Sequence, residues 1–64
     1  MKQFTVKELI AFFGGQVALG EKLEIGQPAI SGWVKKGEVP ILRAWQIQEL
    51  TKGKIKINQL PLGV

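Results

Sequence analysis

The sequence contains no cysteine, no histidine and no aspartate among its 64 residues. Without cysteine there is no disulfide framework, and without cysteine and histidine the usual zinc ligands are missing. The imidazole base and the aspartate nucleophile of many enzymes are also missing, so the only acidic side chains are five scattered glutamates. We therefore expect neither an enzyme nor a protein that needs a metal or another cofactor.

Long apolar runs are lacking as well. No stretch approaches the roughly 20 apolar residues that a membrane-spanning helix needs, and the N-terminal residues lack the apolar segment of a signal peptide. We expect a soluble, cytoplasmic protein with no membrane partner. A chain of 64 residues can form one small domain with a thin core.

The middle of the chain, residues 16–36, has the pattern of two short helices joined by a tight turn. Leu19 and Leu23 are four residues apart, and Ile30 and Trp33 are three apart, so each pair lies on one helical face. The pattern is interrupted between the two pairs. A proline then fits the first turn of a new helix, where its missing N–H has no intrahelical partner. This arrangement predicts a helix-turn-helix motif.

The spacing QxxLGxxLxIxQxAISxW within this segment resembles the helix-turn-helix of phage repressors of the Cro type. The resemblance continues through VPxxRxxxIxELTKG, residues 39–53, which is also similar to small YdaS-like repressors. It implies an all-α, five-helix lambda-repressor-like domain over residues 1–64. An α+β Cro fold with a C-terminal hairpin is the alternative.

Two positions depart from the family pattern. Glu24 stands where a left-handed glycine is usual, and a non-glycine residue in that conformation costs roughly 1 to 2 kcal/mol. Either this turn is strained or its geometry differs from that of the family. Gly20 stands where alanine is usual and costs on the order of 1 kcal/mol inside a helix, so we expect a facing helix to approach it closely.

The second helix of the motif, from residue 27 or 28 to about 36, is the expected recognition helix. Its outward side chains are the expected base contacts: Gln27, Pro28, Ser31, Gly32 and Lys35. Glutamine can bind adenine through two hydrogen bonds, serine several base edges, and lysine guanine or a phosphate. The expected phosphate contacts are Gln16 and Lys36. From the pattern alone, a solvent-facing polar stripe explains these residues equally well, and the family resemblance favours DNA.

The first helix is predicted to begin after Thr5 and to end at Gly14 and Gly15. Thr5 and Glu8 have the spacing of a capping box, in which each side chain accepts a hydrogen bond from the other residue's backbone N–H. The buried side is expected to carry Val6, Leu9, Ile10 and Phe13. Phe12 lies off that face, and we expect it in the core, with a partner contact as the alternative.

A fourth helix is predicted over residues 41–51. Its apolar residues span an arc wider than one packed face of so small a domain needs, which indicates a partner. Cro-type repressors use this region in dimerisation, so the resemblance makes Trp45 and Ile57 candidate dimer contacts. A core tryptophan is the alternative reading of Trp45.

The C-terminal third supports two interpretations. Residues 45–48 and 54–57 both alternate between apolar and polar, as in a hairpin with its turn at residues 51–53. Pairing in that register would set Glu49 against Ile55 and Leu50 against Lys54, which breaks the pattern beside the turn. We therefore favour a fourth helix capped by Gly53, followed by a short last turn over residues 57–60, with the hairpin second.

The net charge of +4 reflects nine basic and five acidic residues. Clustered lysines suit phosphate contacts, and we assign Lys35 and Lys36 to DNA, whereas Lys52, Lys54 and Lys56 fit a solvated face equally well. The expected function is a sequence-specific repressor of the Cro type that binds double-stranded operator DNA as a homodimer, with weak self-association in free solution left open. The alternative is an antitoxin-like protein-interaction module on a helix-turn-helix fold.

Overall fold

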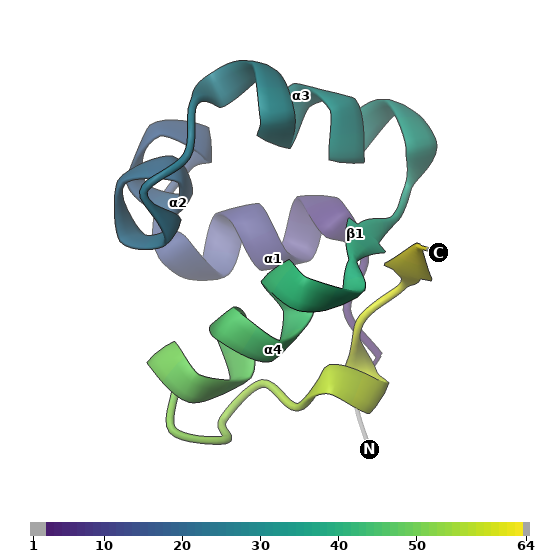
Figure 1. Cartoon of the computed structure of the whole chain (residues 1–64). Helices are drawn as coiled ribbons and strands as arrows, with labels where there is room; N and C mark the ends of the chain where they lie inside the picture. Colours follow the sequence, from purple (N-terminus) through teal and green to yellow (C-terminus); the bar gives the residue numbers. More distant parts are fainter. Residues whose placement is uncertain (1–2, 64) are drawn as a thin grey trace.

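The computed structural model describes residues 3–63, and these form a mostly helical fold with a small sheet (Figure 1). The elements in chain order are α1 (Val6–Phe13), α2 (Gln16–Leu23), α3 (Gln27–Lys36), β1 (Val39–Pro40), α4 (Ile41–Leu50), the 3-10 helix η1 (Ile57–Gln59) and β2 (Leu62–Gly63). Within the described residues there are four α-helices, and the expected last turn is a 3-10 helix. The predicted count of five α-helices is therefore not confirmed.

Helix α1 begins with the predicted capping box. The Glu8 backbone N–H donates to the Thr5 hydroxyl at 3.1 Å, and the Thr5 N–H donates to the Glu8 carboxylate at 2.9 Å. Val6 and Leu9 are buried as expected. Phe12 is 50% exposed, so its expected place in the core is wrong. Its ring instead makes edge contacts with Phe4 and Phe13 on the surface.

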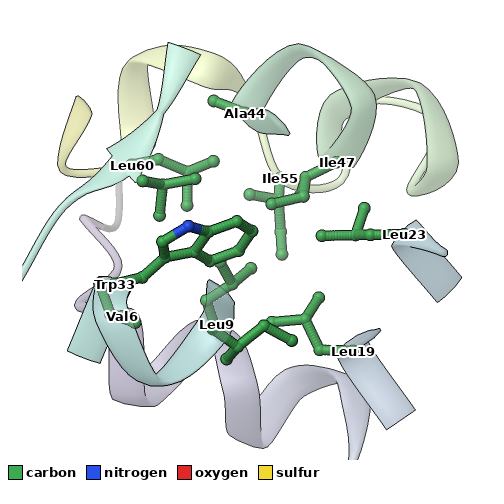
Figure 2. Packing of buried hydrophobic residues seen from close by; sticks show 11 residues of the cluster. Val6, Leu9, Leu19, Leu23, Trp33, Ala44, Ile47, Ile55 and Leu60 are labelled. Carbon is green, nitrogen blue, oxygen red and sulfur yellow. The ribbon is translucent and has the colours of Figure 1, made fainter. Parts of the chain in front are cut away.

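One hydrophobic core joins all four α-helices to the C-terminal segment. Its buried members are Val6, Leu9, Leu19, Leu23, Ile30, Trp33, Val39, Ala44, Ile47, Ile55 and Leu60. Figure 2 shows the Trp33 ring among side chains from α1, α2, α4 and the segment after α4. Both apolar pairs that predicted the helix-turn-helix belong to this core, and Ile25 from the turn packs against it. The core therefore fixes α3 against α1 and α2.

Helices α1 and α2 end in the same turn, although different residues occupy its left-handed position. After α1 this residue is Gly14, with φ 94°, and after α2 it is Glu24, with φ 58°. In each turn one N–H donates to the carbonyl five residues earlier in the helix: Gly15 to Ile10 at 2.9 Å, and Ile25 to Gly20 at 2.9 Å. Both turns are thus Schellman motifs. Of the two readings for Glu24, the structure supports a family-type turn that contains a strained residue.

Gly20 lies where the backbone of this turn passes close to α2. A Cβ atom on Gly20 would lie 2.8 Å from the Ile25 carbonyl oxygen and 3.4 Å from the Ile30 side chain. The expected close approach is therefore confirmed, and the nearest obstacle is the turn itself rather than the facing helix. Even alanine at this position would force the turn backbone to shift.

The C-terminal region does not form the hairpin that was considered. Residues 45–50 belong to α4, and the N–H groups of Lys52 and Gly53 close another Schellman turn, so Lys52 with φ 53° occupies the position expected for Gly53. The small sheet pairs β1 with β2 in parallel, with Val39 opposite Leu62. The fold is therefore helical with a small β component, which remains compatible with an α+β description.

Candidate nucleic-acid interface

Helix α3 lies at one edge of the molecule, and its outer side is open (Figure 1). Ile30 and Trp33 fix its inner side in the core. The expected base contacts lie around the opposite side, where Gln27, Pro28, Ser31 and Lys35 are exposed and Gly32 is half-buried. A helix of ten residues is about 15 Å long, which suits insertion into a major groove about 12 Å wide.

The start of α3 presents its first side chains away from the core. Gly26 caps the helix in an extended conformation, and Gln27 and Pro28 form its first two positions. Both are exposed. In helix-turn-helix proteins the N-terminal residues of the recognition helix contact base edges, and Gln27 and Pro28 are the first two residues of α3.

A hydrogen bond connects the first residue of α2 with the middle of α3. The Ser31 hydroxyl donates to the Gln16 side-chain oxygen at 3.3 Å. The bond therefore joins a residue expected to bind phosphate to one expected to bind a base. The Gln16 amide NH2 keeps its two donors for an outside acceptor. This link was not anticipated from the sequence because the two residues are fifteen positions apart.

Lys35 and Lys36 form the basic end of α3. Both are exposed in the last helical turn, and neither side chain makes an ion pair or hydrogen bond with a described residue. The negative end of the helix dipole favours lysine at this position. Their charge is therefore available to an external anion such as a phosphate.

Gly32 has no neighbour that requires glycine. A Cβ atom at this position would meet nothing within 4 Å, and the residue has no left-handed conformation. The fold itself thus leaves space for a side chain on this outer side of α3. The missing side chain lets an outside surface approach the helix backbone more closely.

Helix α4 presents a different surface. Trp45 is 48% exposed and Leu42 is 79% exposed, and Ile41 beside them is also exposed. Trp45 is therefore not a core residue. Ile57, the other candidate for a dimer contact, is half-buried against the core, and its N–H donates to the Gln48 side chain at 2.9 Å. Of the two candidates, Trp45 is the one with substantial free surface.

A hollow of about 430 Å³ separates α3 from the beginning of α4. Pro28 and Gly32 line it on one side, and Ile41 and Leu42 line it on the other. Sequence reasoning did not identify this hollow or the exposure of Leu42. The sequence showed that α4 has many apolar residues. Which of them remain exposed depends on how α4 packs against the rest of the fold.

A polar connection between α4 and α2 was also missed. The Arg43 guanidinium donates to the Gln46 side-chain oxygen at 2.7 Å, and the Gln46 amide donates to the Leu23 carbonyl at 3.4 Å. Leu23 ends α2, where helix carbonyls lack intrahelical partners. The connection therefore joins α4 to the end of α2, and it leaves Arg43 half-buried.

Within residues 3–63, no group of three or more histidine, cysteine, aspartate or glutamate side chains could hold a metal ion. In the same range, no helix is long and apolar enough to cross a membrane.

Comparison with known proteins identifies the family. A family model described as "DNA-binding transcriptional regulator Cro" matches residues 5–62, which is most of the chain. The chain belongs to this Cro family. A curated relative, "Regulatory protein cro" of Pseudomonas phage D3, is 45% identical over 56 residues, which cover 84% of this chain and 75% of the relative. No solved structure matches the chain significantly.

Membership of the Cro family makes this chain a DNA-binding transcriptional regulator rather than a member of an enzyme family. The matched residues include all four α-helices and extend into the last strand. The part of the chain that matches this DNA-binding family thus includes the helix-turn-helix and the polar outer side of α3.

Proposed function

We propose that this Cro-family protein represses transcription by binding, as a homodimer, to an operator made of two half-sites. Helix α3 would enter the major groove of each half-site. The main support is the outer side of α3, which is polar, exposed and fixed on a helix-turn-helix by two buried anchors, Ile30 and Trp33. Bound across a promoter, such a dimer represses by excluding polymerase.

Bases are read by residues along the whole outer side of α3. Gln27 donates to and accepts from adenine, and Ser31 donates to or accepts from a neighbouring base edge. Lys35 donates to guanine. Pro28 offers its ring to a thymine methyl group, and Gly32 allows the helix backbone to approach the bases.

Phosphates are bound at the two sides of the reading surface. Gln16 lies at the first position of α2, where backbone N–H groups also lack intrahelical partners. Its side chain is already oriented by Ser31. Lys36 lies at the opposite end of the motif, exposed and without an ion pair among the described residues. Two such contacts set the register of α3 without reading sequence.

The dimer is formed through the apolar side of α4. Trp45, Ile41 and Leu42 would make a surface whose contact with a second copy removes a tryptophan and two aliphatic side chains from water. Ile57 adds little contact area to this dimer surface, because most of its side chain is packed against the core. One copy measures 28 × 21 × 19 Å, so two adjacent copies can place their α3 helices about 34 Å apart, one helical turn of DNA.

Selection of bound sequences from a randomised duplex pool tests this proposal directly. We expect a near-palindromic consensus with half-sites about one helical turn apart. Binding of the selected duplex and of a scrambled duplex is then compared at several salt concentrations, since nonspecific binding is almost wholly electrostatic. A consensus without symmetry would contradict the dimeric operator. The antitoxin-like alternative predicts almost no binding to random duplex even at low salt.

A further inference from the structure

A second hollow, of about 330 Å³, lies away from α3, where the ends of α1, α2 and α4 meet. Phe12, Phe13 and Leu50 form its apolar part. Phe12 and Leu50 are among the most exposed large apolar residues outside the side of α4 that carries Trp45, at 50% and 45%. Figure 1 shows the turn after α4 at the far side of the molecule from α3. DNA bound by α3 therefore leaves this hollow open.

Three lysines surround the hollow: Lys22 from the last turn of α2, and Lys52 and Lys54 from the turn after α4. No acidic residue lines it, and none of the three side-chain ammonium groups makes an ion pair or hydrogen bond with a described residue. The hollow thus combines apolar side chains with surrounding lysines whose positive charge no nearby carboxylate neutralises. This combination is complementary to an apolar side chain flanked by carboxylates. A merely solvated group of lysines would not need exposed apolar side chains beside it.

The backbone at Lys52 supports a role for its side chain. Lys52 has φ 53°, in the left-handed region, where glycine is adopted without strain and lysine is not. Strained residues often accompany binding sites, because stability alone favours their replacement. The neighbouring Gly53 shows that this turn already includes glycine, with φ 83°. Lys52 thus holds a strained backbone conformation at the edge of the hollow.

We propose that this hollow is a docking site for an acidic peptide segment of another protein, in which one large apolar side chain is flanked by glutamate or aspartate. The apolar side chain packs against Phe12 and Leu50, and the flanking carboxylates pair with the lysines. Because the site is distant from α3, the peptide and duplex DNA bind at the same time. Peptide binding at this hollow requires neither operator DNA nor the dimer.

The test uses the full chain, labelled with 15N, and a synthetic peptide with one central leucine flanked by glutamates. We expect saturable shifts of amide signals at Phe12, Lys22 and residues 50–54, with signals of α3 unchanged. A peptide with alanine in place of leucine should bind about tenfold more weakly, because the apolar anchor is lost. A peptide with lysines in place of the glutamates should not bind.

Two variants at residue 52 separate binding from stability. Lys52→Gln and Lys52→Gly both remove the charge and should weaken peptide binding about two- to fivefold, the range for an exposed charge pair. Only Lys52→Gly relieves the left-handed strain, so only this variant should melt at a higher temperature. Lys7→Gln is the matched control, because Lys7 is exposed and does not line the hollow, and it should leave peptide binding unchanged.

Three results would overturn the proposal. The first is no shift with the acidic peptide, and the second is equal binding of the peptides with and without the central leucine. The third is tighter binding of a short oligothymidine to the same amides, which would make the hollow a single-stranded nucleic-acid surface. Operator binding is measured separately and does not enter this test, so failure here leaves the proposed repressor function untouched.

Discussion

Helices α3 and α4 have nearly the same construction and opposite outer surfaces. Each is ten residues long, has a proline next to its start, and buries two side chains, Ile30 and Trp33 in α3 and Ala44 and Ile47 in α4. The outer side of α3 carries glutamine, serine and lysines, whereas that of α4 carries isoleucine, leucine and tryptophan.

The comparison shows that the inner residues place a helix and the outer residues select what it binds. A polar, hydrogen-bonding surface suits the wet major groove, where base edges offer donors and acceptors. A surface of large apolar side chains is favoured in contact with another protein, because burial removes it from water. Three of the four substitutions below alter the outer side of α3 or α4, and the fourth alters the turn before α3; the largest expected effect comes first.

Replacing Trp45 with alanine should weaken dimerisation by about 2–4 kcal/mol, the range for a central tryptophan in an interface. The residue is 48% exposed, so the folded monomer should lose much less. Sedimentation gives the dimer affinity and thermal melting gives the stability. Leu50→Ala is the control, because Leu50 is similarly exposed, at 45%, and lies on another side of α4. The Trp45→Ala variant is also melted at a concentration where the parent protein is monomeric. If the variant no longer melts cooperatively there, Trp45 is needed for folding and the proposed interface is wrong.

Replacing Gln27 with alanine should remove roughly 1 to 3 kcal/mol of discrimination at one symmetric position of each half-site. Gln27 is exposed at the first position of α3, and its side chain makes no hydrogen bond with a described residue. The substitution therefore removes no contact within the fold. Binding is compared between the selected operator and single-base variants of it. An equal loss of affinity for operator and random DNA would mean that α3 is not docked as proposed.

Replacing Glu24 with glycine should stabilise the fold by about 1 kcal/mol, because glycine adopts the left-handed conformation without strain. For a domain of this size that raises the melting temperature by roughly 4–8 °C. Gly14→Ala is the opposite substitution in the equivalent turn after α1. It places a side chain at a left-handed position and should lower the stability of the fold. An unchanged or lower midpoint for Glu24→Gly would show that the glutamate side chain stabilises this turn by more than its strain.

Replacing Lys36 with alanine should give the smallest effect, a reduction of about 1 in the slope of log affinity against log salt. Binding to every duplex should weaken alike, because a phosphate contact carries no sequence information. Titrations at several salt concentrations measure the slope. Lys7→Ala, on α1, is the control and should leave the slope unchanged. A change in the preferred base would instead assign Lys36 to base reading.

The helix-turn-helix half of the molecule was predictable because its signals are local. Apolar pairs three or four residues apart predicted α2 and α3, and these residues are buried. The alignment with the family pattern placed Glu24 at the left-handed position, where the structure has it. The capping box at Thr5 and Glu8 needed only four consecutive residues.

The small sheet and the exposure of individual side chains were not predictable because they depend on contacts between distant segments. The strands β1 and β2 have two residues each, too few for an alternating pattern, and 21 residues lie between them. Phe12 is apolar and helical like its buried neighbours, and only the packing of α1 leaves it outside. Within the candidate interface, the residues on the outer side of α3 followed from helical periodicity. The Gln16 contact and the two hollows did not.

The pairing of β1 with β2 makes the last part of the fold a backbone partner of the linker between α3 and α4. The linker after α3 is held by the Val39 N–H, which donates to the Pro61 carbonyl at 2.7 Å, and the N-terminal segment by the Phe4 N–H, which donates to the Gln59 carbonyl at 2.8 Å. The core that holds α1 to α3 also contains Ile47, Ile55 and Leu60 from later segments, so it is complete only when those residues are present. The junction between the reading helix and the apolar helix has its backbone partner only when residue 61 is also in place. The final orientation of α4 relative to α3 therefore depends on the backbone contacts of residues 59–63.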